Sequence, residues 1–455
     1  MYNLFFSKKS IVYANFLTIF LAVFYSLVFY DIAYLLTFFI LYAIFFLYIL
    51  YVKSNDILSI FSILLPIYIF TSFFIAFDYE NAIGVPYGYA DESLFYYLGL
   101  YNHLDMLPTD FHFIHSFTSY IELIDFPAYF EFLKLQGDFY NFIGYQSFMA
   151  FKLISIFVGI VGILIFFKIS QKFFSTKESK ILALVFGLLP LVVYQSSVLM
   201  RDIIIFSLSL YVVLVLLTLN TRNILTLIGT LLLIYLFRPE NGLFMLTLSL
   251  VYYTINISKD KFSKSVMLIS ILIVSIFVLI LFKDKIIYLV DSFSHVQDGY
   301  LARGLEHSSS SSLGAKLRTL PFPINNVSVF IVSQMSPFPF WGLVTNSISP
   351  IIEGIGGFVW YFIWPFVIIA LYKQNIRRKI DSRLFLLFLL FFVYIFLVAN
   401  IQPMQRRLMV GYPFVLMIAY YGYKYTSGKE KAYLSLLSFG LILIVYSVYL
   451  LLKGL

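Results

Sequence analysis

Ile11–Tyr30 reads IVYANFLTIFLAVFYSLVFY, a run of 20 residues without a charged side chain. A helix rises about 1.5 Å per residue, so this run is long enough to cross the ~30 Å hydrocarbon core of a bilayer. Lys8 and Lys9 precede it, and it is longer than the apolar part of a secretory signal and lacks a small-x-small cleavage site. The run therefore predicts an uncleaved first transmembrane helix.

Similar runs recur along the whole chain. Hydrophobic residues make up 61% of the 455 positions and charged residues 12%, and the mean hydropathy is +0.93. These values exclude a soluble globular protein and predict an all-α, polytopic membrane protein with about thirteen transmembrane helices. The tenth predicted span is too long for one helix, so its start is not fixed. The predicted spans are 11–30, 32–52, 57–77, 144–167, 181–199, 203–219, 223–237, 242–257, 265–282, 343–372, 383–399, 408–423 and 432–452.

The distribution of basic residues predicts the topology. With a cytoplasmic amino terminus, 19 of the 31 lysine and arginine residues lie on the cytoplasmic side, as the positive-inside rule requires. We expect a multi-pass protein of the plasma (inner) membrane, with residues 1–455 forming a single transmembrane domain. Two long extracytoplasmic loops follow from this topology, at 78–143 and 283–340. Within the first, Ser119–Leu135 mixes apolar and acidic positions, which predicts one or two interfacial helices or, alternatively, a solvated loop.

Cysteine is absent, so disulfides, thiolate metal sites and cysteine nucleophiles are excluded. The pI of about 9.1 could indicate nucleic acid, but the basic residues lie in short connections between apolar runs, where they report topology. We therefore predict no nucleic-acid partner, and membrane lipids as the surroundings of the chain.

The first candidate for chemistry is an acidic pair that follows the third apolar run. Tyr87–Tyr97 reads YGYADESLFYY, with Asp91 and Glu92 adjacent and flanked by aromatic residues. A carboxylate in a partly dehydrated site can have a raised pKa and act as a general base. A pair of acids on a solvated loop is the alternative interpretation.

Basic residues on the same predicted outer side form the second candidate. A lysine inside a predicted span is expensive and usually faces a cavity or a partner, although it can also extend to the headgroups. Six of the ten arginines are also predicted to lie outside. Guanidinium groups suit phosphate, so we predict an anion site, with Asp202, Glu240 and Arg406 as supporting residues. The predicted phosphate-binding residues are Lys152, Arg201, Arg238 and Arg407.

The turn Arg238-Pro239-Glu240-Asn241 is predicted to lie below the outer surface. Only 15 residues separate Arg222 from Arg238, about 22 Å of helix, which is shorter than the hydrocarbon core. Arg238 and Glu240 could bind an anion there or simply neutralise each other.

A carboxylate and several cations on one face match what glycosyl transfer from a lipid phosphate requires. The carboxylate takes the proton of an acceptor hydroxyl, and the cations stabilise the charge that develops on the departing phosphate. We therefore expect a membrane glycosyltransferase that moves a sugar from a lipid-phosphate donor to a glycan or lipid acceptor on the outer face. No metal ligands are predicted, because His103, His112 and His115 have no recognised zinc spacing. A divalent cation is left open as a cofactor.

The sequence also resembles the GT-C superfamily of integral-membrane glycosyltransferases, in particular the protein O-mannosyltransferases and the lipid A aminoarabinose transferases. The resemblance covers roughly residues 87–260 and 400–420. It implies that Asp91 and Glu92 carry the catalytic acid, that Lys152 is the basic residue opening the next span, and that Arg407 is the final arginine. The acidic pair, however, follows the third span rather than the first. The similar motifs are Gly137-Asp138-Phe139-Tyr140, Phe151-Lys152, Phe173-Phe174, Leu189-Pro190, Tyr194 and Leu199-Met200-Arg201-Asp202.

Two other functions stay open. The chain is similar in length, aromatic content and large outer loops to O-antigen polymerases, which implies a repeat-unit polymerase of O-antigen or capsule. A lipid-oligosaccharide flippase or other transporter is the second alternative; such proteins are typically built from inverted repeats, and none is visible in this sequence.

Overall fold

The computed structural model describes residues 8–83, 92, 95–96, 127–144, 147–256, 320–321, 323–334, 349–401 and 405–453. Within these ranges the regular structure is helical and contains no strand. Six helices are long and apolar enough to span a membrane, and a bent pair raises this number to seven. A multi-pass membrane protein is thereby supported, whereas the number of thirteen spans stays a prediction. The six are Lys9–Phe29, Ile32–Val52, Asn55–Asn81, Phe148–Ser170, Ile355–Tyr372 and Ser382–Asn400.

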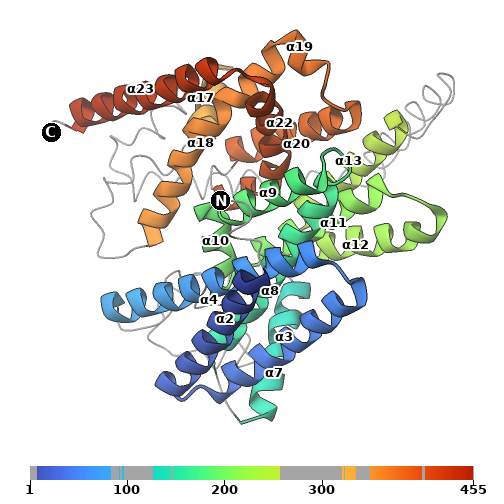
Figure 1. Ribbon diagram of the computed structural model, residues 1–455, viewed down its shortest axis with the longest axis vertical. Coiled ribbons are helices and arrows are strands. Elements are labelled where there is room, and N and C mark those ends of the chain that lie inside the picture. Colours follow the sequence, from blue (N-terminus) through green and yellow to red (C-terminus); the bar gives the residue numbers. More distant parts are fainter. Residues whose placement is uncertain are drawn as a thin grey trace. The chain divides into compact units, whose positions relative to one another are not determined.

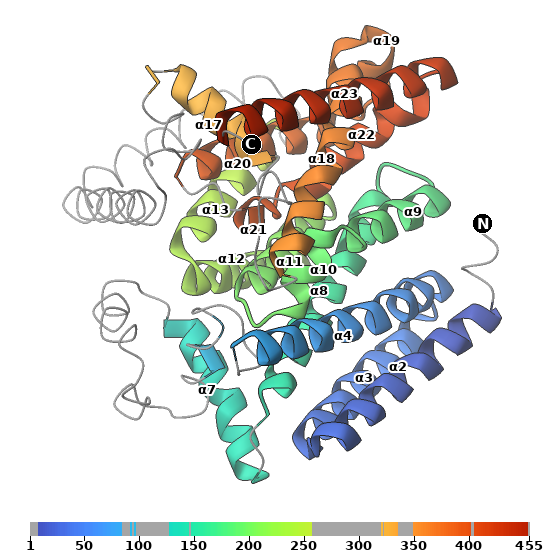
Figure 2. The same ribbon diagram turned by 90° about the vertical axis from the view of Figure 1, so that its left-hand side faces the viewer.

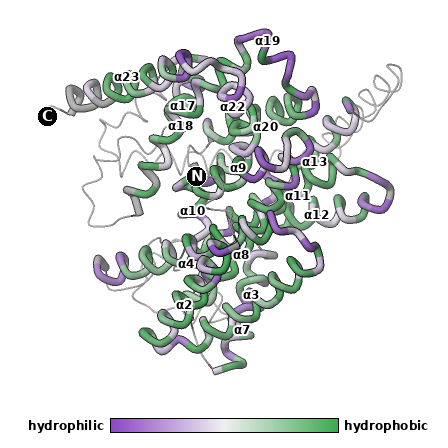
Figure 3. Tube along the Cα trace, viewed as in Figure 1, coloured by the Kyte–Doolittle hydropathy of each residue, from purple (hydrophilic) through white to green (hydrophobic). Residues whose placement is uncertain are grey.

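The chain divides into two compact units. The first unit comprises residues 1–243 and 339–359, and the second comprises residues 244–338 and 360–455. α13 (Pro239–Asn256) and α18 (Ser349–Tyr372) contribute residues to both units. The prediction of a single transmembrane domain over 1–455 stays a prediction. Figure 1 shows the helices coloured along the chain, and Figure 3 shows that hydrophobic residues follow the helices while hydrophilic residues gather at several connections.

The first unit is built around one helix, α8. Its helices are α2 (Lys8–Phe29), α3 (Ile32–Val52), α4 (Asn55–Ile83), α7 (Pro127–Phe142), α8 (Phe148–Ser170), α9 (Thr176–Gly187), α10 (Pro190–Ser197), α11 (Asp202–Leu217), the short 3-10 helix η2 (Thr221–Asn223) and α12 (Ile224–Phe237). The three amino-terminal helices run side by side (Figure 2). α8 packs against α3, α4, α9, α10 and α11, and most of its residues are buried, while Val161 is 39% exposed.

Two glycines let α8 approach its neighbours closely. A Cβ atom at Gly159 would lie 2.8 Å from the Cβ of Ser196 in α10, and one at Gly162 would lie 2.8 Å from the ring of Phe206 in α11. Real Cβ atoms do not come so near, so a larger residue would push these helices apart. The Ser207 hydroxyl of α11 donates to the Val158 carbonyl of α8 at 2.9 Å. Small residues at helix contacts are the usual way to pack membrane helices tightly.

The span predicted at 181–199 is not one straight helix. α9 ends at Gly187, α10 begins at Pro190, and the two helices are bent by 63°. Proline has no N–H and disfavours helical backbone in the residue before it, so the break falls where the sequence places Pro190. The Tyr68 hydroxyl donates to the Gly187 carbonyl at 2.8 Å and satisfies an acceptor that the break releases.

The remaining predicted spans correspond to helices, except the span at 265–282, which lies outside the described residues. In the first outer loop the described helix is α7 (Pro127–Phe142), which overlaps the stretch Ser119–Leu135 predicted to hold one or two helices, and residues 119–126 lie outside the described residues. Its interfacial position stays a prediction. In the second loop the described helix is α17 (Ile324–Gln334).

The second unit has an aromatic core. It comprises α17, α19 (Gln374–Arg377), α20 (Ser382–Ile401), α21 (Gln405–Leu408), α22 (Tyr412–Tyr425) and α23 (Gly428–Lys453), with parts of α13 and α18. α20 packs against α17 and α22. Phe391 of α20 and Phe414 of α22 stack with ring centroids 4.2 Å apart, and Trp360 of α18 lies over Tyr412 at 4.1 Å. Such ring pairs add to the stabilisation from buried area.

Candidate functional site

Glu92 and Lys152 form a fully buried ion pair. The Lys152 Nζ lies 3.1 Å from the Glu92 Oε1, and both side chains have 0% exposure. Lys152 lies one turn into α8, and its ammonium also sits over the Phe148 ring at 4.5 Å from the centroid. Lys152 therefore does not extend to the headgroups, and Glu92 does not lie on a solvated loop.

The Glu92 carboxylate also holds the segment between α10 and α11. The backbone N–H of Leu199 donates to Glu92 Oε1 at 2.8 Å. Residues 198–200 are not helical, yet Val198, Leu199 and Met200 are buried, so their backbone groups need partners within the protein. Glu92 supplies one such partner. Glu92 is thus linked directly to Leu199, which lies 107 residues further along the chain and two residues before Arg201.

Arg238 forms a second buried ion pair at the start of α11. Its Nη1 lies 2.6 Å from the Asp202 Oδ1, and its Nε lies 3.3 Å from the Glu240 Oε1. Arg238 and Asp202 are 3% and 5% exposed, while the Glu240 side chain is 37% exposed. The alternative in which Arg238 and Glu240 neutralise each other is consistent with this geometry, and Asp202 is a further partner that the sequence did not indicate.

The Arg-Pro-Glu-Asn-Gly stretch makes the tight turn that places this pair. Arg238 adopts an extended backbone at the end of α12, and Pro239 opens α13, where a missing N–H is tolerated. A Cβ atom at Gly242 would lie 2.5 Å from the Tyr235 Cα, so only glycine fits this position. Gly242 of α13 can therefore approach Tyr235 of α12 directly after the turn, with Arg238 at the junction of the two helices.

Arg201 lies between the two ion pairs in the sequence. It occupies the N-cap position of α11, and it is only 9% exposed. Asp202 follows it in the first turn of α11, where a negative charge is favoured by the helix dipole. The segment from Leu199 to Asp202 thus joins Glu92 and Lys152 on one side to Arg238 and Glu240 on the other.

The remaining predicted site residues are Asp91, Arg406 and Arg407. Asp91 lies outside the described residues. Arg406 and Arg407 lie on α21 in the second unit, where the Tyr394 hydroxyl donates to the Arg407 carbonyl at 3.1 Å. The prediction that Arg407 joins the first-unit residues around one anion stays a prediction.

A further polar group, which sequence reasoning missed, ties the start of α3 to the start of α8. Asp31 Oδ1 accepts from the Tyr34 N–H at 2.8 Å, and Asp31 Oδ2 accepts from the Ser147 hydroxyl. Ser147 in turn caps α8 by accepting from the Ala150 N–H at 3.0 Å. Burial raises the pKa of the Asp31 carboxyl, and the two hydrogen bonds partly offset this rise. The sequence signal that could have indicated this contact is Ser147, a capping residue placed directly before the apolar run of α8.

Within the described ranges, no three acidic or imidazole side chains come together in a way that could hold a metal ion. His103, His112 and His115 lie outside those ranges.

No protein-family model matches the chain, and comparisons with curated proteins and with solved structures found no match. The fold and composition define the class: this is a multi-pass membrane protein.

Proposed function

We propose that the chain is an extracytoplasmic glycosyltransferase that moves a sugar or oligosaccharide from a polyprenyl phosphate or diphosphate to a hydroxyl acceptor. The observation that supports this is the group of buried ionisable residues around the break between α10 and α11. Five of them are at most 9% exposed, in a chain that is 61% hydrophobic. They are Glu92, Lys152, Arg201, Asp202 and Arg238.

The energetics of burial favour a functional explanation for this group. A buried ion pair is seldom more stabilising than apolar residues of similar volume, because the charges lose their hydration. Ionisable residues within membrane proteins accordingly mark ligand and ion pathways more often than they serve packing alone. A site that holds charge at membrane depth suits a substrate with an anionic headgroup on an apolar chain, which is the chemistry of a polyprenyl phosphate.

The proposed reaction assigns a role to each residue. Asp91 takes the proton of the acceptor hydroxyl, and the acceptor oxygen forms a bond to the anomeric carbon of the donor sugar. The bond between that carbon and the phosphate oxygen breaks, and its electron pair leaves on the lipid phosphate. Lys152, Arg201 and Arg238 stabilise the charge of this leaving group. Glu92, held by Lys152 and the Leu199 N–H, is a positioning residue.

Arg407, with Arg406, is proposed as a further phosphate contact, and Asp202 and Glu240 as the residues that orient Arg238. The donor carries either one sugar or a whole repeat unit, and in the second case the protein is a repeat-unit polymerase.

Two measurements test the proposal. Native mass spectrometry of the protein in nanodiscs compares binding of a polyprenyl phosphate with binding of the uncharged polyprenol of equal length. We expect a preference for the phosphate, reduced about tenfold or more by Arg201→Gln, because a charge-assisted contact is worth roughly 1.5–3 kcal/mol. Lys53→Gln, at an exposed position in the α3–α4 turn, is the matched control and should change nothing.

The second measurement separates binding from chemistry. Asp91→Asn should keep phosphate binding but abolish sugar transfer in membranes supplied with the lipid-linked donor. Full transfer by Asp91→Asn, or equal phosphate binding by Arg201→Gln and the wild type, would contradict the proposal.

A transporter of lipid-linked sugars is the second candidate, and the 63° break between α9 and α10 is the observation that favours it. Discontinuous helices form the substrate sites of many transporters. Vesicles that translocate the lipid-linked sugar without forming a glycosidic bond would assign the chain to this class.

A further inference from the structure

The second unit carries a basic surface at one end of its helices. It is formed by two segments: residues 373–383, from the end of α18 to the start of α20, and residues 424–431, from the last turn of α22 to the first turn of α23. These contain eight basic residues and two acidic residues. The candidate spans on either side of the first segment end at Tyr372 and begin at Ser382, so the segment lies at the level of the lipid headgroups. Figure 3 shows the hydrophilic character of the α19 region.

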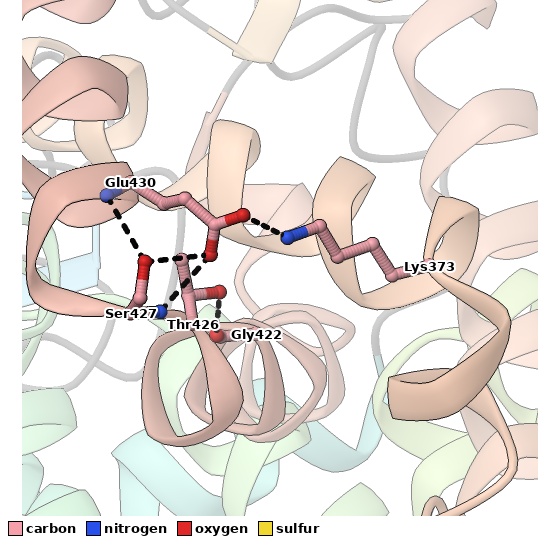
Figure 4. Close-up of polar contacts among 5 residues, drawn as sticks. All are labelled: Lys373, Gly422, Thr426, Ser427 and Glu430. Atoms are coloured by element: carbon pink, nitrogen blue, oxygen red, sulfur yellow. Dashed lines mark hydrogen bonds and ion pairs between the residues drawn. The ribbon is translucent and has the colours of Figure 1, made fainter.

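Side-chain contacts join the two segments into one surface. Lys373 forms an ion pair with Glu430, as Figure 4 shows. The Lys379 Nζ lies over the Tyr425 ring at 3.9 Å from its centroid, and α19 packs against α22. We refer to residues 373–383 and 424–431 together as the basic plate.

The two acids of the basic plate are occupied within the protein. Hydrogen bonds from Lys373 and from Ser427 lower the pKa of Glu430 to about 2, and Glu430 also caps the first turn of α23. Although partial burial opposes it, hydrogen bonding from Arg383 lowers the pKa of Asp381. Both carboxylates are therefore ionised. Each accepts hydrogen bonds at the start of a helix and forms an ion pair with one basic residue, Glu430 with Lys373 and Asp381 with Arg383.

Other cations of the basic plate remain available to an external anion. Arg377, Arg378 and Lys429 are exposed, and none of them takes part in an ion pair with another described residue. Two exposed tyrosines flank the basic plate in the sequence: Tyr372 is 85% exposed, and Tyr423 is 49% exposed and lies under the Lys431 Nζ at 3.9 Å. Tyrosine is enriched at the headgroup level of membranes. Clusters of lysine and arginine next to membrane helices attract anionic lipids.

We infer that the basic plate binds the headgroups of anionic phospholipids in the adjacent leaflet, with Arg377, Arg378 and Lys429 as the main contacts. The inference does not depend on the proposed glycosyltransferase activity. It commits to lipid because the plate lies between helices that end at the headgroup level, where phospholipid phosphates are the most concentrated anions.

Native mass spectrometry tests this by titrating the full-length protein with phosphatidylglycerol or with phosphatidylcholine of the same acyl chains. The wild type should bind phosphatidylglycerol more tightly. The triple variant R377Q/R378Q/K429Q should lose about tenfold to 100-fold of that affinity, since each base near a charged membrane surface contributes roughly fivefold. The variant R377K/R378K/K429R keeps the charges and should keep the affinity.

A charge-matched control excludes a general effect of net charge. K168Q/K172Q/K177Q removes one base from the end of α8, one from its connection to α9 and one from the first turn of α9, and should reduce the affinity far less. The inference is overturned if the wild type does not distinguish the two lipids, if the two glutamine triples behave alike, or if polyglutamate displaces the bound lipid and binds more tightly, which would identify a soluble acidic partner.

Discussion

Removing the charge of Lys152 alone should destabilise the protein far more than removing both charges of its ion pair. In Lys152→Met the Glu92 carboxylate stays buried, with the Leu199 N–H as a hydrogen-bond donor and the Lys152 ammonium gone. In Glu92→Gln the ammonium loses its carboxylate and keeps the Phe148 ring. In the double variant neither charge of the pair remains, and the new side-chain amide oxygen at position 92 can still accept from the Leu199 N–H.

The burial of the ion pair determines how much stability each single variant loses. Both side chains have 0% exposure, so each single variant leaves one ion without water and should lower the free energy of unfolding by about 3–5 kcal/mol. Replacing both charged partners is often nearly neutral, so the double variant should recover most of this loss. The coupling energy between the two sites should accordingly be about 5 kcal/mol or more, since it is the sum of the two single losses minus the loss of the double variant.

The assay is a double-mutant cycle on detergent-solubilised protein, with unfolding followed by denaturant titration and by loss of the monodisperse peak on heating. Met149→Leu, on the same turn of α8 and also buried, is a volume-conserving control that should change stability by less than about 1.5 kcal/mol. A single variant Lys152→Met as stable as the wild type would refute the reasoning, as would a double variant whose loss equals the sum of the two singles.

Two further predictions concern packing and pH. Gly422→Ala should destabilise the second unit by about 2–3 kcal/mol or more, because the new Cβ would lie against the backbone carbonyl of Phe366, only 2.8 Å from its carbon. Gly440→Ala in α23, with open space around the position, should be neutral or stabilising by up to about 1 kcal/mol, and equal effects of the two changes on thermal stability would contradict the packing argument. Because burial raises the pKa of Asp31, the folded protein favours its neutral form, so the stability that Asp31 contributes is fully present below pH 3.8 and is lost as the pH rises through its folded pKa. Asp31→Asn should therefore gain most relative to the wild type at neutral pH and progressively less on acidification, and a gain that is independent of pH between about 4 and 8 would show that Asp31 is not desolvated.

The sequence was sufficient to place most of the helices. An apolar run of about 20 residues needs no tertiary information to be assigned as a spanning helix, since the bilayer fixes its length and each helix satisfies its own backbone hydrogen bonds. The boundaries at Ser147, at the Pro190 break and at Pro239 also have local signals, namely a capping hydroxyl and two prolines. The sequence predicted 181–199 as one span because hydropathy averages over a break that leaves the composition unchanged.

The ion pairs between charged residues, unlike the helices, could not be predicted from the sequence. The sequence singled out Glu92, Lys152, Asp202 and Arg238 because ionisable groups are rare in this chain, but it could not pair them. Glu92 lies 60 residues before Lys152 and 107 before Leu199, and Asp202 lies 36 before Arg238. Such pairs depend on which faces of α8, α11 and α12 meet and on a turn that only Gly242 permits. A charged residue in an apolar segment is rare and costly to bury, and both properties can be recognised from the sequence alone. The partner that neutralises the charge depends on how the helices pack against each other, which the sequence pattern does not specify.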